Sequence, residues 1–275
     1  MKTRRLFYED VYIQEFEAIV LSCEEKDGKY HVILNATAFY PEGGGQPADK
    51  GMIDNIPVAD VQYIDGELCH IMESPLEEGA QVVGKIDWNW RFDLMQQHSG
   101  EHIVSGMIHE KYGYENVGFH MGEEIITIDL SGMLTWQQVQ EIEKKVNYYI
   151  WMNQQVNIFY PDERQRKFIP YRSKKELTGE IRLVEFPGAD LCACCGLHVT
   201  HASQIGLVKI LSCKKFRDGV RMEMLSGKRA LDYLSGSTEQ NSQIAVSLSV
   251  KENETKEAVQ RLLDEVYDLK GQLAQ

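Results

Sequence analysis

The sequence predicts an α+β protein that consists of a small N-terminal β-barrel, a two-layer α/β domain and a C-terminal amphipathic helix. Three observations predict this fold class. Short apolar segments alternate with turn sequences up to residue 90, helical and strand-like patterns are mixed between residues 91 and 236, and an apolar repeat of three and four residues follows residue 237. We therefore expect domains at 1–90, 91–236 and 237–275.

The composition argues against a general nucleic-acid-binding protein, a membrane protein and a secreted protein. The net charge of −13 argues against indiscriminate nucleic-acid binding, and no run of 18 apolar residues predicts a membrane span. The N-terminus has basic residues but no apolar block after them, so we expect no secretory signal and a cytoplasmic protein. Three of the six cysteines lie within four positions, which in a reducing compartment favours metal binding or redox chemistry.

The first domain is expected to be all-β. Residues 18–21 and 30–34 are rich in β-branched side chains, and turn sequences such as Asp27-Gly28 separate the segments. Several short strands at this spacing suggest a small barrel. The run Gly43-Gly44-Gly45 costs backbone entropy, which suits a loop that needs positive φ or a close approach. A plain surface turn is the alternative.

The second domain mixes helices with strands. Residues 92–109 have helical spacing, residues 124–130 resemble a strand, and Thr135 with Gln138 forms a capping-box pattern at the start of a second helix. Further strands are expected at 181–186, 205–211 and 220–225.

The C-terminal segment changes in composition after Gly236 and is expected to be a linker or a loosely packed helix. A coiled-coil seam is then predicted from its apolar repeat, which consists of Val259, Leu262, Val266, Leu269 and Leu273. Because the repeat stops in mid-heptad, we expect either a longer protein or pairing with another chain, such as a second copy. A helix that folds back on its own domain is the alternative.

Basic residues gather in two segments of an otherwise acidic chain, at 164–175 and 205–230. An anionic partner is expected to meet these segments, and its binding is expected to weaken as salt rises. A solvated basic face is the alternative interpretation.

Two histidines four residues apart, His98 and His102, are expected on one face of a helix. Cys194 and His198 repeat this spacing in a loop, so the four residues offer three nitrogens and one thiolate, a donor set that suits zinc. Cys194 has two competitors for the thiolate position, Cys192 and Cys195, while His109, His120 and His201 are less plausible ligands. The ligand types alone leave a structural and a catalytic zinc open.

The first of these segments also satisfies the His-x-x-Glu-His pattern of inverted zinc peptidases. Glu101 would then be the general base, and Glu176 or Glu180 the third ligand. This alternative explains neither the pair of Cys194 and His198 nor the glycine run.

Three motifs together resemble a known family. Residues 37–51 resemble the glycine-rich signature of alanyl-tRNA editing domains, residues 97–103 their first zinc motif and residues 194–199 their second. Residues 117–122, 125–130 and 220–231 also fit. The resemblance runs in order from about residue 5 to 235, without a synthetase aminoacylation core. The chain therefore resembles the stand-alone alanyl-tRNA editing proteins, which are related to the editing domains of alanyl- and threonyl-tRNA synthetases.

The resemblance implies a barrel followed by a zinc-binding editing domain. It also implies ATP-independent hydrolysis, in trans, of the ester between a wrong amino acid and alanine tRNA; the wrong amino acid is chiefly serine and sometimes glycine. The implied zinc ligands are His98, His102, Cys194 and His198. Candidate catalytic residues are Thr37, whose hydroxyl would help to select serine, Gln46 and Glu101. Candidate substrate-binding residues are Gly43, Gly44, Gly45, Thr37 and Arg221.

The second zinc motif departs from the family pattern, because Cys195 replaces a glycine and Leu197 a threonine. In the first motif, Gly100-Glu101 stands where synthetase domains often have Ala-Thr. These departures affect substrate choice more than metal binding. A non-catalytic RNA-binding protein with structural zinc is the remaining alternative function.

Overall fold

The computed structural model describes residues 2–173 and 179–274. Its contacts divide the chain into two compact units, Met1–Lys228 and Arg229–Gln275, which are described separately below. The expected mixture of helices and sheets is confirmed, whereas the domain boundaries at residues 90 and 236 stay predictions. Within the described ranges, no helix combines the length and apolar content needed to cross a membrane.

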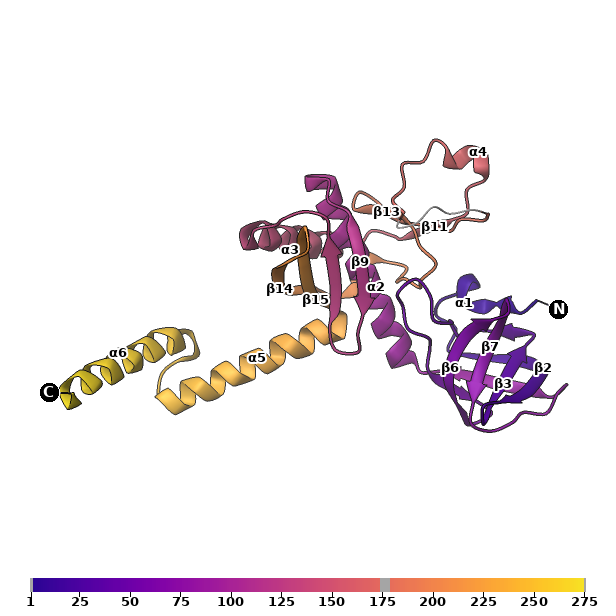
Figure 1. The fold of residues 1–275 in the computed structure, drawn as a ribbon, viewed down its shortest axis with the longest axis horizontal. Coiled ribbons are helices and arrows are strands. Elements are labelled where there is room, and N and C mark those ends of the chain that lie inside the picture. The colour runs from indigo at the N-terminus through magenta and orange to yellow at the C-terminus, as the bar shows by residue number, and fades with distance from the viewer. Residues whose placement is uncertain (1, 174–178, 275) are drawn as a thin grey trace. The chain divides into compact units, whose positions relative to one another are not determined.

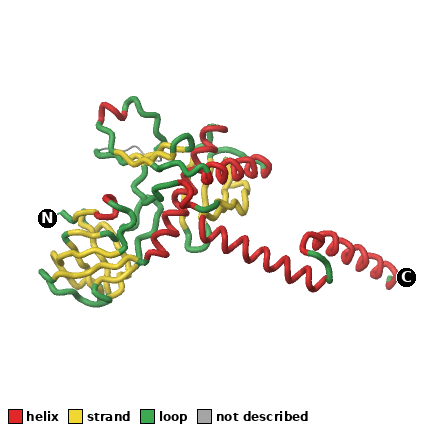
Figure 2. Tube along the Cα trace, turned by 180° about the vertical axis from the view of Figure 1, so that it is seen from behind, coloured by secondary structure: helices red, strands yellow, loops and turns green. Residues whose placement is uncertain are grey.

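The N-terminal part of the first unit contains a closed barrel (Figures 1 and 2). Its strand order is β2-β3-β7-β6-β5-β8. Alternation gives the barrel one buried face: Phe16, Ala18 and Val20 of β2 are buried, while the residues between them are exposed. Before the barrel, the short strand β1 (Arg4–Arg5) pairs in parallel with β4 (Ala36–Thr37), and α1 (Leu6–Glu9) follows β1. The barrel strands are β2 (Glu15–Lys26), β3 (Lys29–Leu34), β5 (Gly51–Ile53), β6 (Ile56–Ile64), β7 (Glu67–Met72) and β8 (Gln81–Ile86).

A fully buried histidine lies among the barrel strands. The carbonyl of Val32 lies 3.0 Å from Nδ1 of His70, and because a carbonyl only accepts, Nδ1 carries the proton. Nε2 therefore accepts from the hydroxyl of Thr37 at 2.8 Å. Burial lowers the pKa of His70 to about 4, and the hydrogen bond to Val32 opposes that shift.

This histidine predicts a pH-dependent stability. Its pKa is lowered on folding, so the unfolded chain binds the proton more readily, and the stabilisation present above the unfolded pKa is lost as the pH falls toward 4. We expect His70 to account for a loss of about 2 kcal/mol in unfolding free energy between pH 7 and pH 5. Urea unfolding of the metal-free protein at both pH values, beside a His70→Gln variant, measures this difference. Equal pH dependence of the two proteins would contradict the assignment.

Helix α2 (Trp88–Tyr112) runs from the barrel to the second sheet (Figure 1). It begins at Asp87, whose side chain accepts from the Trp90 amide, and it ends at Gly113 in the left-handed region. Most of its residues from Leu94 to Ile108 are buried on every face, because it contacts α3, β13, β15 and η1.

A buried arginine in the first turns of α2 ties this helix to the barrel side of the unit. Arg91 is fully buried and forms a bidentate ion pair with Asp49, its Nε lying 2.8 Å from Oδ1. It also donates to the carbonyls of Val11 and Ala38, at 2.9 and 2.5 Å. The Arg91 side chain thus joins α2 to the segment before β2, at Val11, and to the segment after β4, at Ala38.

The second sheet has the antiparallel order β14-β15-β10-β9, and α2 and α3 contact it, which makes the expected two layers. Its strands are β9 (Asn116–Met121), β10 (Ile126–Leu130), β14 (Val208–Phe216) and β15 (Gly219–Ser226). Helix α3 (Trp136–Trp151) starts with the predicted capping box of Thr135 and Gln138, which is confirmed. The strand expected at 205–211 starts later, because Ile205 belongs to the 3-10 turn η1 (Ala202–Ile205).

A smaller three-stranded sheet, β11-β12-β13, presents the second cysteine–histidine segment. It consists of β11 (Asn157–Phe159), β12 (Leu183–Phe186) and β13 (Asp190–Ala193), and the short helix α4 (Glu163–Arg166) precedes β12. The predicted strand 181–186 corresponds to β12, while β11 and β13 were not predicted. Contacts between α2 and β13 bring the two histidine motifs together.

The second unit is helical. Helix α5 (Gly227–Leu248) extends into it, followed by the 3-10 turn η2 (Glu252–Glu254) and by α6 (Thr255–Leu273). The predicted seam from Val259 to Leu273 lies on α6, and its five apolar side chains are exposed there. The helix is therefore described, while its pairing as a coiled coil stays a prediction.

Candidate metal centre

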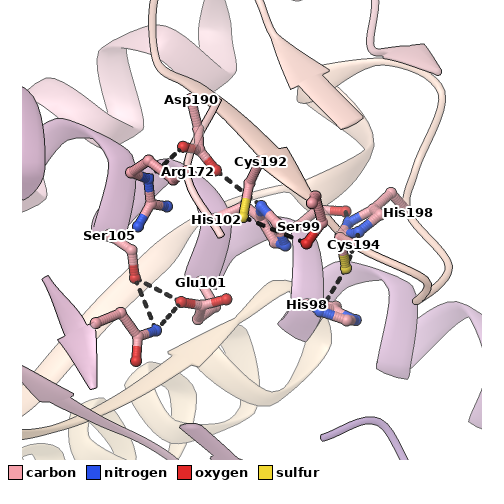
Figure 3. A network of polar contacts seen from close by, with 12 residues as sticks. His98, Ser99, Glu101, His102, Ser105, Arg172, Asp190, Cys192, Cys194 and His198 are labelled. Carbon is pink, nitrogen blue, oxygen red and sulfur yellow. Dashed lines mark hydrogen bonds and ion pairs between the residues drawn. The ribbon is translucent and has the colours of Figure 1, made fainter. Parts of the chain in front are cut away.

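Four side chains, two from a helix and two from a loop, converge in one largely buried cluster. His98 and His102 lie one turn apart on α2, and Cys194 and His198 lie in the segment that follows β13. One donor atom from each residue lies within 4.8 Å of the others (Figure 3). His98 and His102 therefore lie on one helix, as their spacing predicts. The packing of the chain brings Cys194 and His198 next to them.

The sulfur lies at the centre of this arrangement. Cys194 Sγ is 3.5 Å from His98 Nε2 and 3.4 Å from His198 Nε2. The ring of His198 lies 4.5 Å from that of His98 and 4.6 Å from that of His102, between centroids. All three rings are therefore gathered around one thiol.

Each imidazole is oriented by a partner on its other nitrogen. Nδ1 of His98 lies 2.9 Å from Oε1 of Gln46, Nδ1 of His102 lies 2.8 Å from Oδ2 of Asp190, and Nδ1 of His198 lies 3.2 Å from Oγ of Ser99. The oxygens of Gln46 and Asp190 accept, so they place the Nδ1 protons of His98 and His102 on the outside and leave the Nε2 atoms for the centre, as is usual for histidines that bind metals. The Ser99 hydroxyl can accept from His198 in the same way.

The electrostatics favour the cation-binding forms of Cys194 and His198, but not that of His102. Burial alone would raise the pKa of the Cys194 thiol, but the surrounding imidazoles outweigh burial and lower the pKa well below its usual value. Burial and the neighbouring His98 lower the pKa of His198. For His102, burial is outweighed by the Cys194 sulfur and by Asp190, which raise its pKa. A bound cation would displace that proton.

The donor chemistry therefore fits zinc, with three ring nitrogens and one thiolate in reach of a single ion. The competing thiols differ from Cys194. Within the described part of the chain, Cys192 groups only with His102 and Asp190, and burial raises its pKa to about 11, which keeps it protonated. The Cys195 sulfur lies 3.8 Å from the Tyr40 hydroxyl. Among the described residues, His109, His120 and His201 belong to no such group.

A cavity of about 480 Å³ opens beside the cluster. The glycine run forms one of its walls, as a tight turn in which Gly43 and Gln46 exchange two backbone hydrogen bonds of 3.0 Å. Gly44 and Gly45 have φ values of +63° and +84°. A Cβ atom would lie 2.8 Å from the Cys195 sulfur at Gly44, and 2.8 Å from the Phe119 ring at Gly45. Both the backbone conformation and the space therefore require glycine.

Gln46 links this turn to the metal cluster. Its side chain is fully buried, and Oε1 accepts from the Leu197 amide at 3.0 Å as well as contacting His98. Its Nε2 has no hydrogen-bond partner in the described part of the chain. Gln46 therefore holds the His98 ring and the segment of the second zinc motif in place through one oxygen atom.

The other predicted site residues lie outside the cavity wall. The Thr37 hydroxyl accepts from the Phe39 amide and donates to His70 inside the barrel. The buried carboxylate of Glu101 accepts from Asn116 and from Ser105, and Figure 3 shows the contact with Ser105. Arg221 forms a bidentate ion pair with Asp129, with distances of 2.6 and 2.8 Å.

The peptidase alternative finds little support in this geometry. Cys194 and His198 lie in the same cluster as His98 and His102, and the peptidase alternative gives these two residues no role. The Glu101 carboxylate accepts hydrogen bonds from Ser105 on α2 and Asn116 on β9. Glu180 lines a different cavity, and Glu176 lies outside the described residues.

Sequence reasoning missed Asp190, Ser99 and Phe119. Asp190 bridges His102 to Arg172, whose Nε lies 2.8 Å from Oδ1, and Phe119 stacks on the His98 ring with centroids 5.5 Å apart. The only local signal was the position of Phe119 in a motif that fitted the family, since nothing in the spacing of Asp190 or Ser99 identifies their partners.

Comparison with known proteins gives consistent results. Residues 5–90 match the model of class II (A) tRNA synthetases, and residues 181–222 match the threonyl and alanyl tRNA synthetase second additional domain. The chain is 34% identical to alanyl-tRNA editing protein Aarsd1-B of Xenopus laevis, over 94% of this chain and 67% of that protein. It is 32% identical to alanyl-tRNA editing protein AlaX-L of Pyrococcus horikoshii, over 84% of this chain and 60% of that protein. An alanine–tRNA ligase of Ignicoccus hospitalis is 35% identical, over 84% of this chain but only 26% of the ligase.

Proposed function

Because the chain belongs to the alanyl-tRNA editing proteins, we propose that it is a zinc-dependent hydrolase that acts in trans on mischarged alanine tRNA. The ester that it cleaves joins serine, and in some cases glycine, to the 3′ end of that tRNA. The observation that carries this proposal is the convergence of three imidazoles and one thiolate beside a cavity whose wall is a glycine turn.

The residues of the cavity have separate tasks in this proposal. His98, His102, Cys194 and His198 hold the zinc ion, which when bound supplies a positive charge that stabilises the developing oxyanion of the ester. Gly44 and Gly45 let the backbone approach the aminoacyl group. Gln46 and Asp190 keep the imidazoles of His98 and His102 turned to the centre. Glu101 supports α2 from beneath His102, through Ser105 and Asn116.

An editing site of this kind answers a specific chemical problem. Serine differs from alanine by one hydroxyl, and a synthetase pocket rejects such an analogue by only about 100-fold, so a second site is needed. A cavity that hydrogen-bonds the serine hydroxyl leaves a polar group unpaired when alanine is bound, and this spares the correct product. We propose that Thr37 contributes to this selection, as the family resemblance implies, although in the structure its hydroxyl donates to His70 and lies outside the cavity wall.

The Thr37 role leads to a test. Replacing Thr37 by the isosteric valine is expected to lower the ratio of kcat/KM for Ser-tRNA over Ala-tRNA by about 10- to 100-fold, because the hydroxyl that discriminates is lost. Single-turnover deacylation of the two charged tRNAs measures this ratio. His70→Gln is the matched control, since it changes the internal partner of Thr37 and retains the hydroxyl. Unchanged selectivity in Thr37→Val, or an equal loss in both variants, would contradict a direct role in selection.

The nucleic-acid partner is proposed to contact the basic segments with its acceptor stem. Not every predicted cation is available, because Arg172, Lys209 and Arg221 form ion pairs with Asp190, Glu143 and Asp129. Arg164, Lys167, Lys214 and Lys215 are exposed, while Lys174 and Lys175 lie outside the described residues.

We also propose that the apolar seam of α6 pairs with a second copy of the chain, and that the protein works in the cytoplasm.

A deacylation assay with alanine tRNA charged with serine, glycine or alanine tests the proposed function, together with zinc analysis of the same sample. We expect the serine ester to be hydrolysed, the alanine ester to persist and a chelator to abolish activity. RNA binding without loss of the ester would indicate a non-catalytic protein instead. Cleavage of peptides that disappears in Glu101→Gln would indicate a peptidase.

A further inference from the structure

A second cavity, of about 270 Å³, meets the metal-side cavity at residues 193–195. Its remaining wall is different in chemistry, because two arginines and two tyrosines line it, together with one acid. These residues are Arg5, Tyr8, Tyr160, Arg182 and Glu180. The proposed function uses none of them so far.

Arg182 is a buried cation without an acidic partner. Its side chain is only 8% exposed, and its Nη1 donates to the carbonyls of Cys194 and Gly196, at 2.8 and 2.9 Å. Its Nε has no hydrogen-bond partner, and no carboxylate lies within ion-pair distance, among the residues that the structure describes. A guanidinium removed from water in this way is costly unless an anion neutralises it.

The guanidinium groups of Arg5 and Arg182 both lie over the aromatic ring of Tyr8. The Cζ atoms of Arg5 and Arg182 lie 5.3 and 5.0 Å from the centroid of Tyr8. The Tyr8 hydroxyl is fixed by a 2.7 Å hydrogen bond to the carbonyl of Cys195. Two like charges on one ring repel each other, and Glu180, the one acid in the wall, leaves the cavity with a net positive charge.

We propose that this cavity binds a phosphate group of the unpaired 3′ strand of the tRNA, with Arg5 and Arg182 as its cationic contacts. The inference rests on the proposed function, because it places the strand beside the ester. Three features favour a single-stranded nucleic acid. The two guanidiniums suit a phosphate, the exposed ring of Tyr160 offers a face on which a base stacks, and the shared wall at residues 193–195 adjoins the metal cluster.

Arg5 allows a test that does not depend on catalysis. Arg5→Gln is expected to weaken the binding of uncharged alanine tRNA by about fivefold to tenfold at low salt, and to make the log–log salt dependence shallower by about 0.7. Arg4→Gln is the matched control, because Arg4 is the neighbouring arginine, is paired with Glu9 and does not line the cavity. Arg182→Lys, which keeps the charge, is expected to retain more affinity than Arg182→Gln.

A tRNA that lacks its unpaired 3′ nucleotides identifies the part of the RNA that is bound. The difference between Arg5→Gln and Arg4→Gln is expected to disappear with this shortened RNA. An equal effect of Arg5→Gln on both RNAs, or equal affinities of the two variants for intact tRNA, would overturn the proposal. Because the readout is binding, a protein that binds in this way without cleaving the ester would refute the proposed function and leave the phosphate site standing.

Discussion

Replacing Cys194 by alanine is expected to remove most of the bound zinc and to lower deacylation by more than about 100-fold. Loss of a residue that merely orients a ligand typically costs 10- to 100-fold in metal affinity or activity, and loss of the thiolate itself exceeds that. The reason is geometric, since the Cys194 sulfur lies within 3.5 Å of two of the three imidazoles. Zinc per chain, measured by atomic emission, and single-turnover hydrolysis of the serine ester test this expectation.

Cys192 supplies the matched control, because it is a second thiol two residues away, on β13, and it also lines the metal-side cavity. Its raised pKa favours the thiol over the thiolate, so Cys192→Ala is expected to keep its zinc. Equal loss of zinc from both variants would refute the choice of Cys194 as the ligand. Far-ultraviolet circular dichroism of the two proteins separates loss of metal from loss of fold.

Replacing Arg91 by methionine is expected to lower the free energy of unfolding by about 3 to 5 kcal/mol, because it leaves the Asp49 carboxylate buried without its cation. Asp49 also accepts from the Tyr40 amide at 2.5 Å, so it stays in place after the change. Arg91 lies two helical turns before His98, and its contacts join α2 to Val11 and Ala38. Urea denaturation at neutral pH measures the loss.

Arg4→Met is the control for this prediction, since Arg4 forms an exposed ion pair with Glu9, and pairs of that kind contribute little. The double variant Arg91→Met with Asp49→Leu is expected to recover part of the stability, because no charge is then left unpaired. An Arg91→Met protein as stable as Arg4→Met would show that the buried pair does not hold α2.

Much of the fold followed from local patterns. The capping box of Thr135 and Gln138 predicted the start of α3, and the short β-branched segments between turn sequences predicted strands in the first domain. The strand boundaries near residue 205 were wrong by three residues, because a 3-10 turn there is stabilised by contacts with α2 and α3 that no local pattern records. The short strands β11 and β13 pair only through β12, and a strand of three or four residues has too little sequence of its own to be predicted.

The sequence by itself determined the donor types and their spacing, because a helix places residues four apart on one face whatever surrounds it. His98 and His102 could therefore be paired without coordinates. Only the tertiary structure decided which of three neighbouring cysteines faces them, that Asp190 and Ser99 orient their rings, and that the Thr37 hydroxyl donates to His70. These outcomes depend on contacts between residues that are 33 to 99 positions apart, and such contacts are set by how the barrel, α2 and β13 pack. Backbone geometry is local and can be inferred from the sequence, whereas packing is a property of the whole chain.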